Sequence, residues 1–158
     1  MLKNFLTIGL FLLIISSITL SQSKEGYKPV NEFDPDRNAA KDIQDATAEA
    51  QRLSKRIILD VGGDWCIWCH RIDNFIETHK EINEYLHENF ILVKINYSKE
   101  NKNEEVLSNY PEIPGYPHFF VLESNGKLLN SQDTSELEQD KGYSVDKMMA
   151  FLKKWTSH

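Results

Sequence analysis

The stretch that decides the fold is Trp65–His70, which reads WCIWCH and holds both cysteines of the 158-residue chain. It follows a short apolar segment, Ile57–Val61, in which Asp60 is the only charged residue. Cys66 and Cys69, two thiols at this spacing on the first turn of a helix, can close a small disulfide and open it again. The same letters match Cys-x-x-Cys-His, the haem-attachment pattern of c-type cytochromes. The rest of the sequence has to decide between a redox pair and a haem site.

The N-terminus predicts export. Lys3 provides a short positive region, and Phe5–Leu20 is almost unbroken apolar sequence. A membrane-spanning helix needs roughly 20 apolar residues, which is more than this run contains. We therefore expect a signal peptide at residues 1–21, cleaved between Ser21 and Gln22. An uncleaved N-terminal anchor is the alternative, and in both cases we expect the folded part in the periplasm or an equivalent exported space.

Composition and cysteine number narrow the function. The chain has 24 acidic and 18 basic residues and a net charge of −6. No cluster of lysine and arginine stands out, so we expect no nucleic-acid partner. Exported proteins often use disulfides as structural staples. Because the only possible disulfide here closes a very short loop, it removes little entropy from the unfolded chain. The cysteine pair is therefore predicted to be reactive rather than structural.

The pattern of apolar and turn residues predicts one α/β domain at residues 39–158, after a polar linker or irregular lead-in at 22–38. The predicted helices span residues 39–53, from about 65 to 76, 82–86 and 103–110, and a last helix follows Ser144 as its N-cap. The predicted strands span residues 57–61, 90–97, 118–122 and 127–131, with Asn125-Gly126 as a hairpin turn between the last two. Residues 132–142 are acidic and polar and are predicted to form a loop.

With its elements in this order, the chain resembles the thioredoxin-like superfamily over roughly residues 39–156, in particular its exported single-domain members with a Trp-Cys-x-Trp-Cys site. Three features carry the resemblance. The WCIWC stretch lies at a strand-to-helix junction. Asp60 lies six residues before Cys66, at the position of the family's buried carboxylate. Gly115, Tyr116 and Pro117 precede a strand, where the family keeps a cis-proline. The resemblance implies a thioredoxin-like fold, a central mixed β-sheet flanked by helices.

The resemblance also implies roles for three residues. Cys66, at the N-terminus of a helix whose free N–H groups favour a thiolate, would be the nucleophile. Cys69, one turn further into the helix, would resolve the mixed disulfide. Burial would raise the pKa of Asp60 and allow this carboxylate to take the proton from Cys69. The alternatives are an inert buried cysteine pair and a strand-end aspartate that caps the following turn or faces water.

Around the cysteines, the resemblance implies substrate-binding roles for Trp65, Tyr116 and Pro117. Trp65 would pack over the active-site surface. A cis Pro117 would expose the backbone of Tyr116, so that an extended substrate segment could pair with it. The alternatives are core aromatic residues and an ordinary trans-proline that opens a strand.

Three further residues would tune the redox pair. Ile67 and Trp68, between the cysteines, provide no histidine that would stabilise a thiolate, and this favours a reductant. His70 is the proximal iron ligand in the haem interpretation and a helix-surface residue in the thioredoxin interpretation. A zinc site would need a fourth ligand at a suitable spacing, which the sequence does not offer. We therefore expect neither a metal nor another cofactor.

The predicted function is that of an extracytoplasmic thiol–disulfide oxidoreductase that reduces or isomerises protein disulfides through Cys66 and Cys69. Its expected partners are substrate proteins with disulfides and, for a reductase, a membrane or soluble electron donor. We expect a monomer. The alternative is a binding module that uses the same fold to hold a peptide or protein without catalysis.

Overall fold

The computed structural model describes residues 26–157, so the predicted signal peptide lies outside the described residues. The helices are α1 (Ala39–Leu53), α2 (Ile67–Thr78), α3 (Lys80–Asn89), α4 (Glu104–Leu107) and α5 (Val145–Trp155). The strands are β1 (Arg56–Gly62), β2 (Phe90–Asn96), β3 (His118–Leu122), β4 (Leu128–Asp133), β5 (Glu138–Gln139) and β6 (Gly142–Tyr143), and a 3-10 turn, η1, spans Thr134–Leu137.

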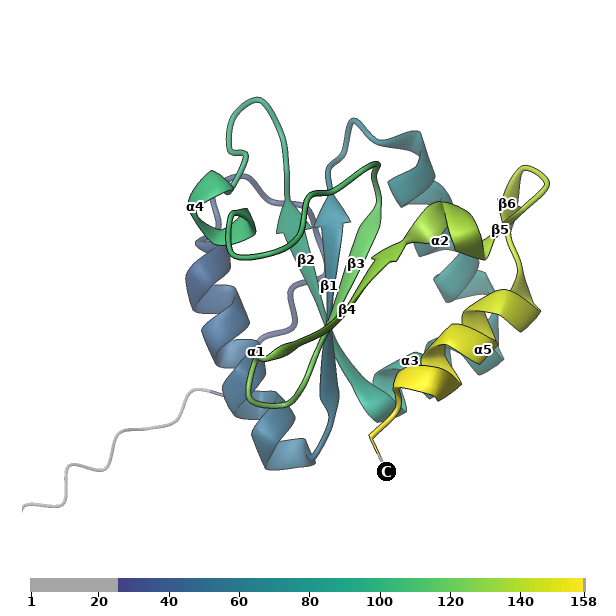
Figure 1. Ribbon diagram of the computed structural model, residues 1–158, viewed down its shortest axis with the longest axis horizontal. Coiled ribbons are helices and arrows are strands. Elements are labelled where there is room, and N and C mark those ends of the chain that lie inside the picture. Colours follow the sequence, from purple (N-terminus) through teal and green to yellow (C-terminus); the bar gives the residue numbers. More distant parts are fainter. Residues whose placement is uncertain (1–25, 158) are drawn as a thin grey trace, which may run out of the picture.

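The predicted α/β architecture is confirmed (Figure 1). Four strands form a mixed sheet in the order β2-β1-β3-β4. β1 runs parallel to β2, and β3 is antiparallel to both β1 and β4. Helices α1 and α4 lie on one side of the sheet, and α2, α3 and α5 lie on the other (Figure 1). Among residues 26–157, no helix is long and apolar enough to cross a membrane.

β1 lies inside the sheet and is buried along almost its whole length. Its alternate side chains point to opposite faces, as the pleat of a strand requires. Ile57, Leu59 and Val61 join the apolar cluster under α1, together with Phe120 of β3. Ile58 joins the other cluster. β1 therefore contributes to two separate cores.

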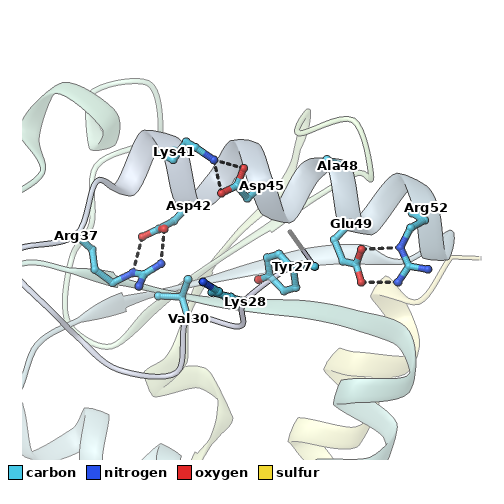
Figure 2. Close-up of a pocket in the computed structure, with 11 residues that line it drawn as sticks. Tyr27, Lys28, Val30, Arg37, Lys41, Asp42, Asp45, Ala48, Glu49 and Arg52 are labelled. Atoms are coloured by element: carbon cyan, nitrogen blue, oxygen red, sulfur yellow. Dashed lines mark hydrogen bonds and ion pairs between the residues drawn. The ribbon is translucent and has the colours of Figure 1, made fainter. Parts of the chain in front are cut away.

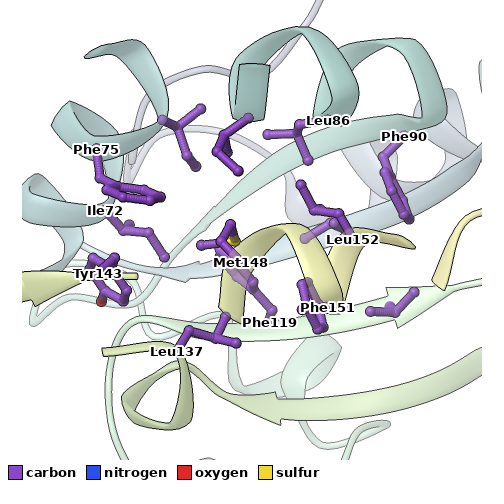
Figure 3. Close-up of a cluster of buried hydrophobic side chains, with 14 residues drawn as sticks. Ile72, Phe75, Leu86, Phe90, Phe119, Leu137, Tyr143, Met148, Phe151 and Leu152 are labelled. Atoms are coloured by element: carbon purple, nitrogen blue, oxygen red, sulfur yellow. The ribbon is translucent and has the colours of Figure 1, made fainter. Parts of the chain in front are cut away.

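The second core lies under α2, α3 and α5, and Figure 3 shows its side chains meeting between these helices and the sheet. Ile72 and Phe75 come from α2, Leu86 from α3, and Met148 and Leu152 from α5. All five are apolar residues at helical spacing, which is the pattern that predicted these helices. Their packing fixes α2 on the sheet and thereby positions its N-terminus, where the cysteines lie.

The lead-in is irregular, as predicted, but its described part packs on the domain. Val30 forms a parallel bridge with Val93 of β2, and the Lys94 amide donates a hydrogen bond to the Val30 carbonyl over 3.1 Å. Further along, Asn101 Nδ2 donates to the Pro35 carbonyl over 2.9 Å. The lead-in is therefore attached to the outer side of β2, the edge strand of the sheet.

A pocket opens between the lead-in and α1 (Figure 2). Three ion pairs line it: Arg37 with Asp42, Lys41 with Asp45, and Arg52 with Glu49. None of the predicted active-site residues lines this pocket. Of these pairs, Arg37–Asp42 helps to hold the lead-in beside α1, because Arg37 belongs to the lead-in and its Nε reaches Asp42 on the helix at 2.9 Å, whereas the other two pairs lie within α1.

The prediction of a loop at residues 132–142 is wrong. β4 continues to Asp133, η1 follows, and β5 pairs with β6, which begins at Gly142. The polar composition of the segment suggested a loop, but Thr134 and Leu137 are buried and attach it to the domain. Thr134 Oγ1 donates a hydrogen bond to the Pro117 carbonyl over 2.5 Å. This segment is therefore held by side chains that contact distant parts of the chain.

Element ends differ slightly from the predictions. α2 begins at Ile67 rather than near Trp65, and α4 is shorter than the predicted helix at residues 103–110. The N-cap of α5 is confirmed, since the Lys147 amide donates to Ser144 Oγ. The predicted turn at Asn125-Gly126 is also confirmed: Gly126 has a φ of 85° and its amide donates to the Glu123 carbonyl.

Candidate active site

Both cysteines lie at the N-terminus of α2, directly above the end of β1. Cys66 is the N-cap of the helix, and its sulfur forms a disulfide with that of Cys69. The Cys69 amide donates to Cys66 Sγ over 3.1 Å and to the Cys66 carbonyl over 3.0 Å. Cys66 is 4% exposed and Cys69 is fully buried. Cys66 is therefore the outer sulfur, next to the free N–H groups of the helix end.

Gly62, the last residue of β1, lets the strand approach the disulfide closely. A β-carbon built on Gly62 would lie 2.5 Å from Cys69 Sγ and 3.0 Å from Cζ of Phe33. Real β-carbons do not approach other atoms this closely, so only glycine fits here without a shift of its neighbours. The sulfur of Cys69 and the ring of Phe33 therefore both border the small space over Gly62.

Asp60 is fully buried two residues before Gly62, on the face of β1 that α2 covers. Neither of its carboxylate oxygens has a hydrogen-bond partner among the described residues. Burial raises the pKa of Asp60 to about 7, while the nearby charge of Lys94 lowers it and that of Asp73 raises it. A carboxyl group with a pKa in this range can take up or release a proton at neutral pH.

Lys94 is the charged neighbour of Asp60 on the sheet. It lies opposite Asp60 in the parallel register of β1 and β2. Its ammonium group forms an ion pair with Asp73 of α2 and lies 4.5 Å from the centre of the Phe33 ring. Asp73 and Phe33 thus hold the charge of Lys94, and the Asp60 carboxylate has no direct ion pair.

An aromatic rim surrounds the cysteine motif. Trp65 is 57% exposed, and its indole Nε1 donates to the Tyr97 carbonyl over 2.6 Å. Its ring meets Tyr116 edge to face at 5.6 Å, and Tyr116 stacks on Tyr97 at 4.8 Å. The Tyr116–Pro117 peptide bond is cis. Trp65, Tyr116 and Pro117, named from the sequence as substrate-binding residues, are therefore brought close to the disulfide, since Tyr116 also packs on the cysteines.

The two residues between the cysteines behave differently. Ile67 is 61% exposed. Trp68 points inward: its ring meets Tyr143 edge to face at 5.8 Å, and the Arg71 guanidinium lies 4.4 Å from the ring centre. Ile67 is therefore available to a partner at the surface, whereas Trp68 joins α2 to Tyr143 of β6.

The His70 side chain binds the turn that precedes the motif. Its Nε2 donates to the Asp64 carbonyl over 2.8 Å. The haem interpretation needs two free thiols for thioether bonds, whereas here both sulfurs are bonded to each other. Among residues 26–157, no group of three or more histidine, cysteine or acidic side chains is arranged to hold a metal ion.

The sequence did not point to Phe33, Lys94 or Asp73. Lys94 could have been noticed as the only charge inside the apolar strand Phe90–Ile95. Phe33 is one of two aromatic residues in a polar stretch and gives no signal of its own. Asp73 lies on a helix that also carries Glu77. Only the packing of the lead-in and α2 brings these three side chains together.

The model of the thioredoxin-like family matches residues 38–124 of this chain. That span contains β1, the cysteine motif, β2 and β3. The chain belongs to the thioredoxin-like family. The match begins at the residue before α1, so Phe33 and the rest of the lead-in up to residue 37 lie outside it.

Relatives of this family member include redox proteins. The disulfide bond reductase DsbH of Chlamydia pneumoniae is 26% identical over 105 residues, which are 58% of this chain and 63% of the relative. The chain thus matches less than two thirds of the length of that relative. A disulphide isomerase from Xylella fastidiosa Temecula1 has a TM-score of 0.67 and 26% identity, over 77% of this chain and 94% of that structure.

A third comparison supports the fold alone. The oxidised C-terminal domain of DsbD from Neisseria meningitidis has a TM-score of 0.54 and 19% identity. The likeness covers 75% of this chain and 96% of that domain. This chain therefore shares its fold with that domain.

Proposed function

We propose that this protein is a thiol–disulfide oxidoreductase that reduces or isomerises disulfides of exported proteins. One observation carries the proposal: a disulfide between Cys66 and Cys69 at a helix N-terminus, above a buried carboxyl group without hydrogen-bond partners. Such a pair can cycle between dithiol and disulfide, and the carboxyl group can take up the proton that the cycle releases. The similarity to a disulfide bond reductase and to a disulphide isomerase supports the same chemistry.

In the reducing direction, the reaction begins with the dithiol. The Cys66 thiolate attacks one sulfur of a substrate disulfide, a mixed disulfide forms, and the other substrate sulfur leaves as a thiolate. Asp60 then takes the proton of the Cys69 thiol. The Cys69 thiolate attacks Cys66 Sγ, the bond from Cys66 to the substrate breaks, and the second substrate sulfur leaves. Two electrons have passed to the substrate, and the protein has reached the disulfide state described above.

The surroundings of the motif suit a protein substrate. Trp65, Ile67 and Tyr116 form a partly exposed apolar surface around Cys66. An apolar rim next to a reactive sulfur can bind a peptide segment through burial of its side chains. We propose that an extended substrate segment lies along this rim. Because the disulfide must be reduced again after each cycle, a reductase also needs an electron donor that presents a thiol to Cys66.

A redox titration tests the direction of electron flow. Mature protein is equilibrated in glutathione or dithiothreitol buffers, and alkylation with intact mass reports the state of Cys66 and Cys69. A potential near or below about −220 mV indicates a reductase, and one between roughly −180 and −120 mV indicates an isomerase or oxidase. The apolar pair Ile67 and Trp68 leads us to expect the lower value.

A cysteine substitution separates catalysis from binding. Cys66→Ser removes the nucleophile, so reduction of a protein disulfide should fall by several orders of magnitude, as for other lost nucleophiles. Cys69→Ser should instead trap the substrate as a mixed disulfide on Cys66. If both variants bind a partner as wild type does, and wild type reduces no disulfide, the protein is a binding module.

Export is proposed from the sequence. Fractionation of cells that express the full chain, followed by N-terminal sequencing, should find a mature protein outside the cytoplasm that begins at Gln22. A protein that keeps Met1 and sediments with membranes would support the anchored alternative. An intact chain in the cytoplasm would contradict export.

A further inference from the structure

We propose that the lead-in, residues 26–38, completes the active site by placing Phe33 as a positioning residue that keeps water away from Cys69 and Asp60. This inference rests on the proposed function, because it assigns Phe33 a part in the proton transfer between these two residues. Apart from its last residue, the lead-in lies outside the region that the family model matches.

The first observation is where the Phe33 ring lies. Phe33 is 4% exposed, although it comes from an irregular segment, and it forms one apolar cluster with Cys66 and Cys69. Its Cζ and the sulfur of Cys69 both border the space over Gly62. The ring therefore covers the inner sulfur of the disulfide.

The second observation is that β2 is an edge strand. The sheet ends at β2, so no further strand covers the outer side of Lys94, which is paired with Asp60 in the register of β1 and β2. The lead-in supplies this cover. Val30 pairs with Val93, and three residues later the Phe33 ring lies under the Lys94 ammonium at 4.5 Å. The backbone pairing thus fixes the start of the segment that carries the ring.

The third observation concerns the charges around Asp60. Lys94 faces it from β2, Asp73 acts on it from α2, and Tyr143 is the titratable neighbour from β6. On β3, His118 makes a ring contact with Phe120 of the α1-side core, so it lies on the opposite face of the sheet. Of the three groups that face Asp60, only Lys94 carries a positive charge, and Asp73 and Phe33 both hold its ammonium.

These contacts explain how a carboxyl group can stay without a partner next to a lysine. With Phe33 in place, water is excluded and the Lys94 ammonium stays between Asp73 and the ring. Asp60 is then left as the base for Cys69. Without the ring, water reaches both groups. Hydration favours their charged forms, so the pKa values of Asp60 and Cys69 should both fall.

Alkylation of Cys69 in the full chain tests this role. The Cys66→Ser background leaves one thiol, and its reaction with iodoacetamide is followed by intact mass from pH 5 to pH 9. Phe33→Ala should raise the alkylation rate at pH 7 by about tenfold and move the midpoint of the pH profile to lower pH, because the thiol becomes accessible and hydrated. Phe33→Leu should change the alkylation rate and the midpoint less, since a leucine side chain still covers part of the Cys69 sulfur.

The matched control is Phe90→Ala. It removes a different buried ring, which lies at the end of β2 away from the cysteines. It should leave both the alkylation rate and the midpoint at the wild-type values. The proposal is wrong if Phe33→Ala has no effect, or if Phe90→Ala produces the same effect through general loosening of the fold. This comparison involves no substrate, so it gives its answer even if the protein proves to reduce no disulfide.

Discussion

The two faces of β1 show how one strand can serve both packing and chemistry. Toward α1 it presents Ile57, Leu59 and Val61, three large apolar side chains that belong to one core. Toward α2, the corresponding series is Ile58, Asp60 and Gly62, of which only the first is a large apolar residue. Near the end of the strand, the α2 face therefore has no large apolar side chain. Asp60 and the sulfur of Cys69 lie there instead.

The difference indicates where substitutions should affect stability and where they should affect reactivity. A cavity on the α1 face should weaken the fold and leave the chemistry of the disulfide unchanged. On the α2 face, loss of the Asp60 carboxyl group should change the chemistry of the cysteines, and a β-carbon added at Gly62 should clash with Cys69 Sγ. The four predictions below test this separation.

The largest effect is expected on the α1 face. Leu59 is fully buried, so Leu59→Ala should lower the free energy of unfolding by about 2–5 kcal/mol through lost burial and a residual cavity. Urea unfolding measures this loss. Under native conditions the alkylation rate of reduced Cys66 should stay at the wild-type value, and a large change in that rate would show that the two faces are coupled.

Asp60 should make stability depend on pH. Burial raises its pKa to about 7 in the folded protein, from an ordinary value of 3.8, so the folded state binds an extra proton between these values. The contribution of Asp60 to the free energy of unfolding is fully present below about pH 4. It falls as the pH rises to 7, by up to roughly 4 kcal/mol. Urea unfolding at pH 5 and pH 8 should show this fall in wild type.

Asp60→Asn is the matched variant, because it keeps the shape and removes the titration. The part of the pH 5 to pH 8 fall that Asp60 causes should disappear, and the resolving step should slow by about a hundredfold without its base. If wild type and variant lose stability equally between the two pH values, Asp60 does not titrate as proposed.

Gly62→Ala adds a methyl group to the α2 face and should destabilise the protein. Its β-carbon would meet Cys69 Sγ, and overpacking of this kind lowers the free energy of unfolding by about 1–3 kcal/mol. Gly115→Ala is the control, since a β-carbon there has no neighbour within 4 Å. Urea midpoints of the oxidised proteins compare the two. Equal midpoints would mean that the space over Gly62 adapts freely.

The smallest effect is expected from Lys94. Its charge lowers the pKa of Asp60, so Lys94→Met should move the titration of Asp60 to higher pH by about one unit or less. The infrared band of the buried carboxyl group follows this titration directly. Lys80→Met, on the exposed side of α3, removes the same charge far from the site and should leave the band unchanged. A shift to lower pH would contradict the assigned role of Lys94.

The sequence by itself determined the parts that depend on local patterns. The order of helices and strands follows from apolar periodicity, and the position of Cys66 at a helix start follows from the strand and turn before it. Asp60 could be named because a single charge inside an apolar strand is conspicuous. These features need only residues that are close together in the chain.

Tertiary structure alone decided what surrounds them. Phe33 reaches the cysteines because the lead-in pairs with β2. Asp73 forms an ion pair with Lys94 because α2 packs over β1, which lies next to β2 in the sheet. The segment at 132–142 takes its structure from Thr134 and Leu137, which are buried against distant residues. Such contacts leave no periodic signal, since each depends on one side chain and on partners far away in the sequence. The pKa of Asp60 has the same origin, because burial is a property of the folded chain.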